Sequence, residues 1–128
     1  MDSYLGNNIF LNNPLQNIKS AYLASALYLM PSRWEGFPMV LLEAISYGLP
    51  AISFNCQTGP ADIINDNEDG FLIEPNNVED FINKIIILID DEQLRVKMSQ
   101  HAILNSKRFI SSQIYYKWDK LFSFLTDN

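Results

Sequence analysis

Pro31-Ser32-Arg33-Trp34-Glu35-Gly36-Phe37-Pro38-Met39-Val40-Leu41-Leu42-Glu43-Ala44 is the stretch that decides the fold of this sequence. An apolar run over 26–30 precedes it, and the apolar residues within it continue to a glycine at position 48. The pattern predicts a buried strand that ends at Pro31, followed by a helix over about 38–47. Ligands of open α/β sheets bind where a parallel strand ends and the next helix begins. The stretch therefore predicts a ligand site at the carboxyl edge of a sheet.

The loop and first helical turn of this stretch have the features of an anion site. A glycine at position 36 allows a close approach that a side chain would block. The amides at the start of the helix point outward with the positive end of its dipole. The backbone groups expected to line the site are those of Gly36, Phe37, Pro38, Met39 and Val40.

Two carboxylates flank this anion site. The helix is apolar nearly all round, so we expect it to be buried, and Glu43 within it then needs a hydrogen-bond partner. Sugar hydroxyls would supply one. Glu35 lies in the loop just before the helix, close to the same amides. Taken singly, each glutamate fits a capping or solvated acid, but the pair around an anion site fits a sugar nucleotide.

Short apolar runs and helical patterns alternate along the rest of the chain. Strands are expected over 9–11, 26–30, 50–54 and 70–73, and helices over 14–23, 38–47, 60–64, 78–89, 92–105 and 112–126. This alternation predicts an α/β fold, with a Rossmann-like parallel sheet flanked by helices. We expect one domain over 1–128 that ends in an amphipathic helix. Because no βα unit with a Gly-rich loop comes first, the domain is expected to be partial.

Composition excludes several function classes. The formal net charge of -6 argues against a nucleic-acid partner, because phosphate binding needs a basic face. The single cysteine allows neither an internal disulfide nor a cysteine-based metal cluster. The longest apolar run, 85–89, is far shorter than the roughly 20 residues that span a bilayer. We expect a soluble, cytoplasmic protein, peripheral at the inner face of the membrane in its full-length form.

The long motif resembles a known family. Its Glu-x7-Glu spacing, followed by Gly48-Leu49-Pro50, is similar to the C-terminal donor-binding domain of retaining GT-B-fold glycosyltransferases. These form the group 1 family typical of bacterial polysaccharide synthesis. The similarity covers roughly 9–102 and includes Thr58-Gly59-Pro60 and the segment 67–73.

The resemblance implies a role for each matching residue. Glu43 matches the glutamate that holds the ribose hydroxyls, and Glu35 matches the catalytic-site glutamate that contacts the transferred sugar. The segment at Asn12 and Asn13 matches the border of the base. Amides of Gly36, Phe37 and the neighbours of Pro38 match the turn that meets the hexose, and those of Met39 and Val40 match the diphosphate site. The family is metal-independent, and this sequence has no Asp-x-Asp metal motif.

The resemblance also implies what the whole protein does. It would transfer a hexose from a nucleoside diphosphate sugar, expected to be a UDP-sugar, to a glycan or lipid-linked acceptor. The family's first two βα units and its N-terminal acceptor domain are not visible here, so we expect a fragment that is inactive alone and forms a weak homodimer. The alternative is a non-catalytic α/β interaction domain that binds no sugar nucleotide. The surroundings of Glu43 distinguish the two, because a sealed carboxylate would favour the alternative.

Overall fold

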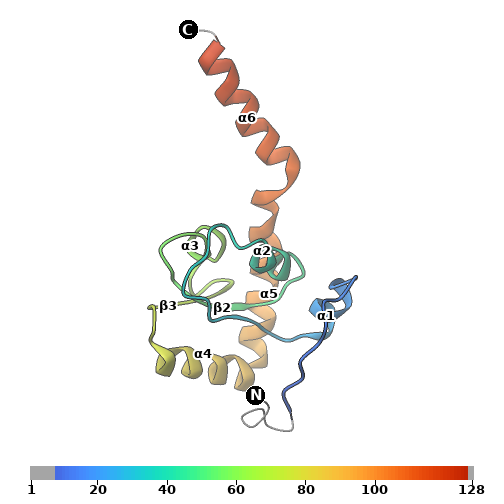
Figure 1. Ribbon diagram of the computed structural model, residues 1–128, viewed down its shortest axis with the longest axis vertical. Coiled ribbons are helices and arrows are strands. Elements are labelled where there is room, and N and C mark those ends of the chain that lie inside the picture. The colour runs from blue at the N-terminus through green and yellow to red at the C-terminus, as the bar shows by residue number, and fades with distance from the viewer. Residues whose placement is uncertain (1–7, 127–128) are drawn as a thin grey trace.

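A computed structural model describes residues 8–126 as a small parallel sheet with helices on both faces (Figure 1). The strands are β1 (Tyr28–Met30), β2 (Ala51–Phe54) and β3 (Gly70–Ile73), in the order β1-β2-β3. Ala51 is aligned with Tyr28 on one side and with Gly70 on the other. The predicted class, an α/β fold with a parallel sheet, is confirmed.

The helices follow the alternation expected of this class. They are α1 (Lys19–Ala24), α2 (Met39–Ser46), α3 (Pro60–Ile63), α4 (Val78–Asp90), α5 (Glu92–Ser106), the 3-10 helix η1 (Lys107–Phe109) and α6 (Ser111–Thr126). Side chains fix two of the starts. Asn77 accepts a hydrogen bond from the Asp80 amide at 3.1 Å, and Asp91 accepts one from the Leu94 amide at 2.8 Å. Such caps satisfy amides that a helix leaves unpaired at its first turn.

The central strand builds the core on both faces of the sheet. Every residue of β2 is buried. Ala51 packs in one cluster with Leu41 of α2, whereas Ile52 packs in a second cluster with Leu88 of α4. Helix α5 contributes Ala102 to the first cluster and Met98 to the second. Successive side chains of β2 therefore point to opposite faces of the sheet, and α5 packs in both clusters. Together they hold α2 against the sheet.

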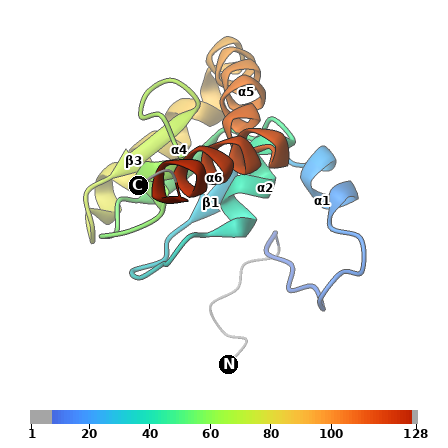
Figure 2. The same cartoon turned by 90° about the horizontal axis from the view of Figure 1, so that it is seen from above.

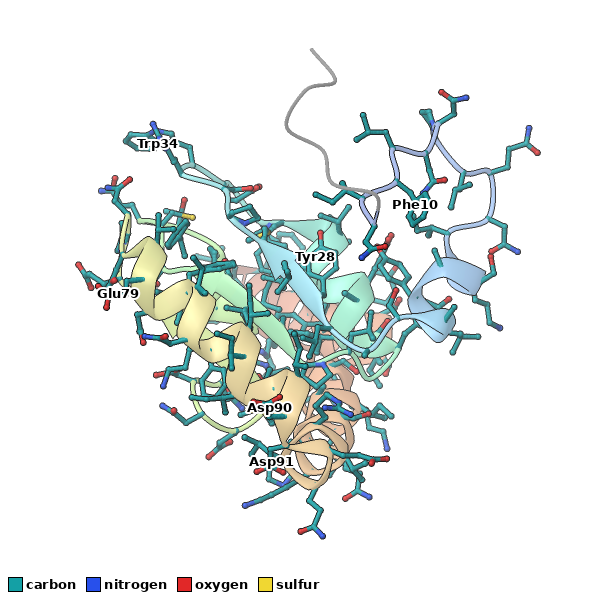
Figure 3. The ribbon with its side chains drawn as sticks, turned by 90° about the horizontal axis from the view of Figure 1, so that it is seen from below. Phe10, Tyr28, Trp34, Glu79, Asp90 and Asp91 are labelled. Atoms are coloured by element: carbon teal, nitrogen blue, oxygen red, sulfur yellow. The ribbon has the colours of Figure 1, made fainter. Side chains whose placement is uncertain are left out.

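The prediction of a strand over 9–11 is wrong. Ile9, Phe10 and Leu11 have no regular structure, and their exposed fractions are 55%, 78% and 81%. Figure 3 shows Phe10 on an irregular segment outside the sheet. A strand needs a neighbour for its backbone groups and cover for one face. The described chain gives this short run neither, and the sheet has three strands instead of four.

The expectation that α2 is buried all round is also wrong. Leu41, Ala44 and Ile45 form one buried stripe, at the spacing of a helix face that packs on a sheet. Met39 and Val40, at the carboxyl edge of the sheet, are 58% and 49% exposed. The ring centroid of Phe109 in η1 lies 5.8 Å from that of Phe37 at this edge, but Met39 and Val40 remain open to solvent.

A buried polar link ties α5 to the loop before β3. Asp69 is fully buried and accepts hydrogen bonds from the Asn65 amide, at 2.9 Å, and from the Asn105 side chain. Asn105 also donates to the carbonyl of Ile63 at 3.0 Å. Burial raises the pKa of the Asp69 carboxyl, whereas the hydrogen bonds from Asn65 and Asn105 oppose that shift.

Helix α6 extends away from the sheet and its covering helices (Figure 1), and in the view from above it lies in front of them (Figure 2). Every residue of it is exposed, including Trp118 and Phe122, which stack with ring centroids 5.6 Å apart. The amphipathic helix expected over 112–126 is thus present, one residue longer at its start. Within residues 8–126, no helix combines the length and apolar character needed to cross a bilayer.

Candidate functional site

The candidate site lies on the loop 31–38, which joins β1 to α2. The loop after β2 holds this loop in place. The hydroxyl of Thr58 donates to the Glu35 carbonyl at 2.6 Å. Gly59 has a φ of 98°, and a side chain there would place its Cβ 2.3 Å from the Gly36 carbonyl oxygen. Only glycine allows the two loops to approach this closely. Buried Pro38 then begins α2 as its N-cap residue.

The amino end of α2 is open. No side chain caps it, and the amides of Phe37, Met39 and Val40 make no hydrogen bond to any residue in 8–126. All three residues are exposed. Unpaired amides at the positive end of a helix dipole attract an anion. The amides predicted to bind the diphosphate are therefore unpaired and accessible to a ligand.

Space for a ligand also exists at Gly36. A Cβ added there would have no atom within 4 Å, and its φ is not positive. Neither packing nor backbone conformation requires a glycine at this position. Gly59 differs, because its surroundings exclude a side chain and the fold therefore requires a glycine there.

Glu43 lies on the exposed side of α2. Its carboxylate accepts a hydrogen bond from the Tyr22 hydroxyl at 3.3 Å, and that hydroxyl lies 3.4 Å from the carbonyl oxygen of Val40. Burial, followed by the Glu43 charge, raises the pKa of Tyr22 to about 12. Glu43 also borders a cavity of about 220 Å³, together with Met39 and Ser46. Its other hydrogen-bonding positions are open to a ligand.

The side chain of Tyr28 links the two predicted carboxylates. Burial raises the pKa of Tyr28, and the charges of Glu35 and Glu43 raise it further. Both carboxylates therefore lie within electrostatic reach of one phenol on β1, whose position Figure 3 shows. The cavity that Glu43 borders is not lined by Glu35. The single cleft expected to hold both stays a prediction.

The structure does not bring the predicted base-binding residues to this site. Asn12 and Asn13 are exposed in the irregular segment before α1. Neither makes a hydrogen bond to a residue of the loop 31–38 or of α2. Their assignment to the base stays a prediction.

Two residues of the site were not predicted as such. The sequence places Tyr22 only on the apolar face of a helix, and Thr58 only within a family motif. The signal at Tyr22 is a phenol at a buried position, because a buried hydroxyl usually has a partner. That partner is Glu43. At Thr58, the sequence alone offers no comparable signal.

Comparison with known proteins matches both the sequence and the fold. The family described as "Glycosyl transferases group 1" matches residues 4–104. The amylovoran biosynthesis glycosyltransferase AmsD of Erwinia amylovora is 42% identical over 109 residues, which are 85% of this chain and 30% of that protein. The crystal structure of TarM superposes with a TM-score of 0.82 at 29% identity, covering 90% of this chain and 23% of TarM.

A further solved structure contains ligands. The pneumococcal O-GlcNAc transferase GtfA, in complex with UDP and GlcNAc, superposes with a TM-score of 0.72 at 27% identity. The match covers 88% of this chain and 23% of GtfA. The chain thus spans less than a third of the length of each of these three proteins.

Proposed function

The chain belongs to the glycosyl transferases group 1 family, and we propose that it is the donor-binding portion of a retaining glycosyltransferase. The whole protein would transfer a hexose from a UDP-sugar to a glycan or lipid-linked acceptor in polysaccharide biosynthesis. The complex of GtfA with UDP and GlcNAc supports the donor class, and the role of AmsD in amylovoran biosynthesis supports the pathway class. We also propose a metal-independent reaction and a cytoplasmic protein, peripheral at the inner face of the membrane.

One observation carries the proposal. The pKa of Tyr28 is raised by burial and then by the charges of both Glu35 and Glu43, and the open amino end of α2 begins just after the loop that carries Glu35. Amides between two acids suit a molecule with a diphosphate in the middle and hydroxyl-bearing rings at each end. Glu43 is exposed, and Tyr22 is its single hydrogen-bond donor in the described chain. This openness favours donor binding over the non-catalytic interaction domain.

The proposed roles follow from these positions. Glu43 holds the ribose diol, with Tyr22 fixing the orientation of its carboxylate. The amides of Met39 and Val40 stabilise the charge that develops on the departing diphosphate, as preorganised donors do in other enzymes. Glu35 contacts the transferred hexose. Such a site lowers the activation barrier of the transfer by stabilising the leaving group, and it needs no protein nucleophile.

Titration calorimetry of UDP against the chain tests the proposal. The variant Glu43→Gln should weaken UDP binding about tenfold, since a hydrogen bond to a charged group is worth roughly 1.5–3 kcal/mol. Glu79→Gln is the matched control, because it makes the same change at an exposed glutamate of another helix, α4 (Figure 3). Equal UDP affinity in both variants would rule out the ribose role, and no UDP binding to the unaltered chain would rule out the donor site.

A further inference from the structure

A second cavity lies beside the candidate donor site, and the proposed function does not use it. Its volume is about 360 Å³, and residues from three loops at the carboxyl edge of the sheet line it. Arg33 and Trp34 come from the loop after β1, Gln57 from the loop after β2, and Pro75 and Asn76 from the loop after β3. The Glu43 carboxylate borders a different cavity, between α2 and the chain that leads into α6.

The walls of this cavity combine an apolar base with polar groups at its edge. The apolar part comes from Phe54 and Cys56, which are both buried, and from Pro75. The side chains of Arg33, Gln57 and Asn76 have no hydrogen bond to any residue within 8–126. Small-molecule sites have this composition, in which a few convergent polar groups surround an apolar surface.

Trp34 is the most unusual part of the lining. Its side chain is 79% exposed at the tip of the loop 31–38 (Figure 3), although tryptophan is highly buried on average. A flat indole beside unpaired amide groups and a guanidinium suits a pyranose ring, which has one apolar C–H face and a rim of hydroxyls. At about 30 Å³ per water, the cavity has room for about a dozen waters, enough for one sugar ring.

The cavity is fixed relative to the predicted reaction centre. Arg33 and Trp34 directly precede Glu35, and the hydrogen bond from Thr58 to the Glu35 carbonyl ties that loop to the loop that carries Gln57. The cavity therefore holds a fixed position relative to the backbone of Glu35, whose side chain is not part of the lining. We propose that this cavity binds a hexopyranose unit of the acceptor glycan, an inference that rests on the proposed transfer of a hexose at Glu35.

Tryptophan fluorescence tests the inference. The chain contains two tryptophans, so Trp118→Phe leaves Trp34 as its only indole. Titration with methyl α-D-glucopyranoside and methyl α-D-galactopyranoside should change the Trp34 emission saturably, with a dissociation constant in the millimolar range for at least one of them. Gln57→Ala should weaken that binding several-fold. Because Trp118 and Gln57 are both exposed, thermal unfolding should show that neither variant loses the fold.

Two results would overturn the inference. One is an emission that no glycoside changes at concentrations of tens of millimolar. The other is a saturable response to UDP that competes with the glycosides, because the cavity would then bind the nucleotide. Calorimetry with UDP on the same protein separates this failure from that of the proposed function. Lost UDP binding with retained glycoside binding would refute the donor site, whereas the opposite pattern would refute the sugar site.

Discussion

The substitution Gly36→Ala should damage ligand binding without damaging the fold. A Cβ at Gly36 meets no protein atom within 4 Å, and the φ of this residue is not positive. Replacing such a glycine restricts the unfolded chain, which stabilises the folded state by about 0.4–1 kcal/mol. In the proposed site, however, the added methyl group occupies the position where the transferred hexose meets the turn. Overpacking of this kind costs about 1–3 kcal/mol.

The size of the effect should depend on the ligand. The turn at Gly36 is assigned to the hexose and the amides of Met39 and Val40 to the diphosphate. The affinity for a UDP-hexose should therefore fall about tenfold or more, while the affinity for UDP alone should change less. Calorimetry with UDP and with UDP-glucose or UDP-N-acetylglucosamine measures this difference, and chemical denaturation measures the stability.

Gly59→Ala is the matched control, because the same methyl group there meets the fold. Its Cβ would lie 2.3 Å from the Gly36 carbonyl oxygen, at a φ of 98°. We expect a loss of about 1–3 kcal/mol of folding free energy from the backbone conformation alone. The reasoning fails if Gly36→Ala lowers the stability as Gly59→Ala does, or if it leaves the affinity for the UDP-hexose unchanged.

Three further predictions concern stability and association. The pKa of Tyr22 is raised to about 12, so the folded state holds this proton more tightly than the unfolded state, and stability should fall between about pH 10 and pH 12. Tyr22→Phe should remove that fall in alkaline unfolding curves, and an unchanged pH profile would contradict it. Asn105→Ala should lower the free energy of unfolding by about 1.5–3 kcal/mol, because buried Asp69 loses a donor. An equal effect of Asn83→Ala, at an exposed site on α4, would contradict this. Sedimentation should show weak dimers that Phe122→Ser dissolves, because it breaks the exposed apolar surface of α6, whereas a monomer at all concentrations would contradict this.

The helices after position 78 agree closely with the sequence because their signals are local. Helices predicted over 78–89 and 92–105 are observed as Val78–Asp90 and Glu92–Ser106. Asn77 and Asp91 cap them, and asparagine and aspartate are favoured residues at this position. The strands β2 and β3 were also predictable, since each is a short apolar run that the fold buries.

Elements that depend on distant partners were less predictable. The apolar run over 9–11 has the composition of a strand, but no strand of the described sheet pairs with it. Likewise, an apolar sequence does not tell which side of α2 is covered, and Met39 and Val40 lie on a side that stays exposed.

The candidate site also has a part that the sequence predicts and a part that depends on distant partners. Glu35, Gly36 and Glu43 lie within one loop and the helix that follows it, so their closeness in the sequence places them near the same amides. The hydrogen bond from Tyr22 to Glu43, the bond from Thr58 to Glu35 and the cavity beside Trp34 all join separate segments. Tertiary packing produces these contacts, so the sequence gives no direct signal of them.

The most direct test of the central claim is the set of amide chemical shifts of the chain on titration with UDP. The donor site predicts that the largest changes fall on Phe37, Met39 and Val40, the amides without a partner at the start of α2. The same changes should need a higher UDP concentration in Glu43→Gln. Saturable shifts that cluster elsewhere, for example around Asn65 and His101 at the cavity beside α5, would contradict the claim, as would no shifts at all.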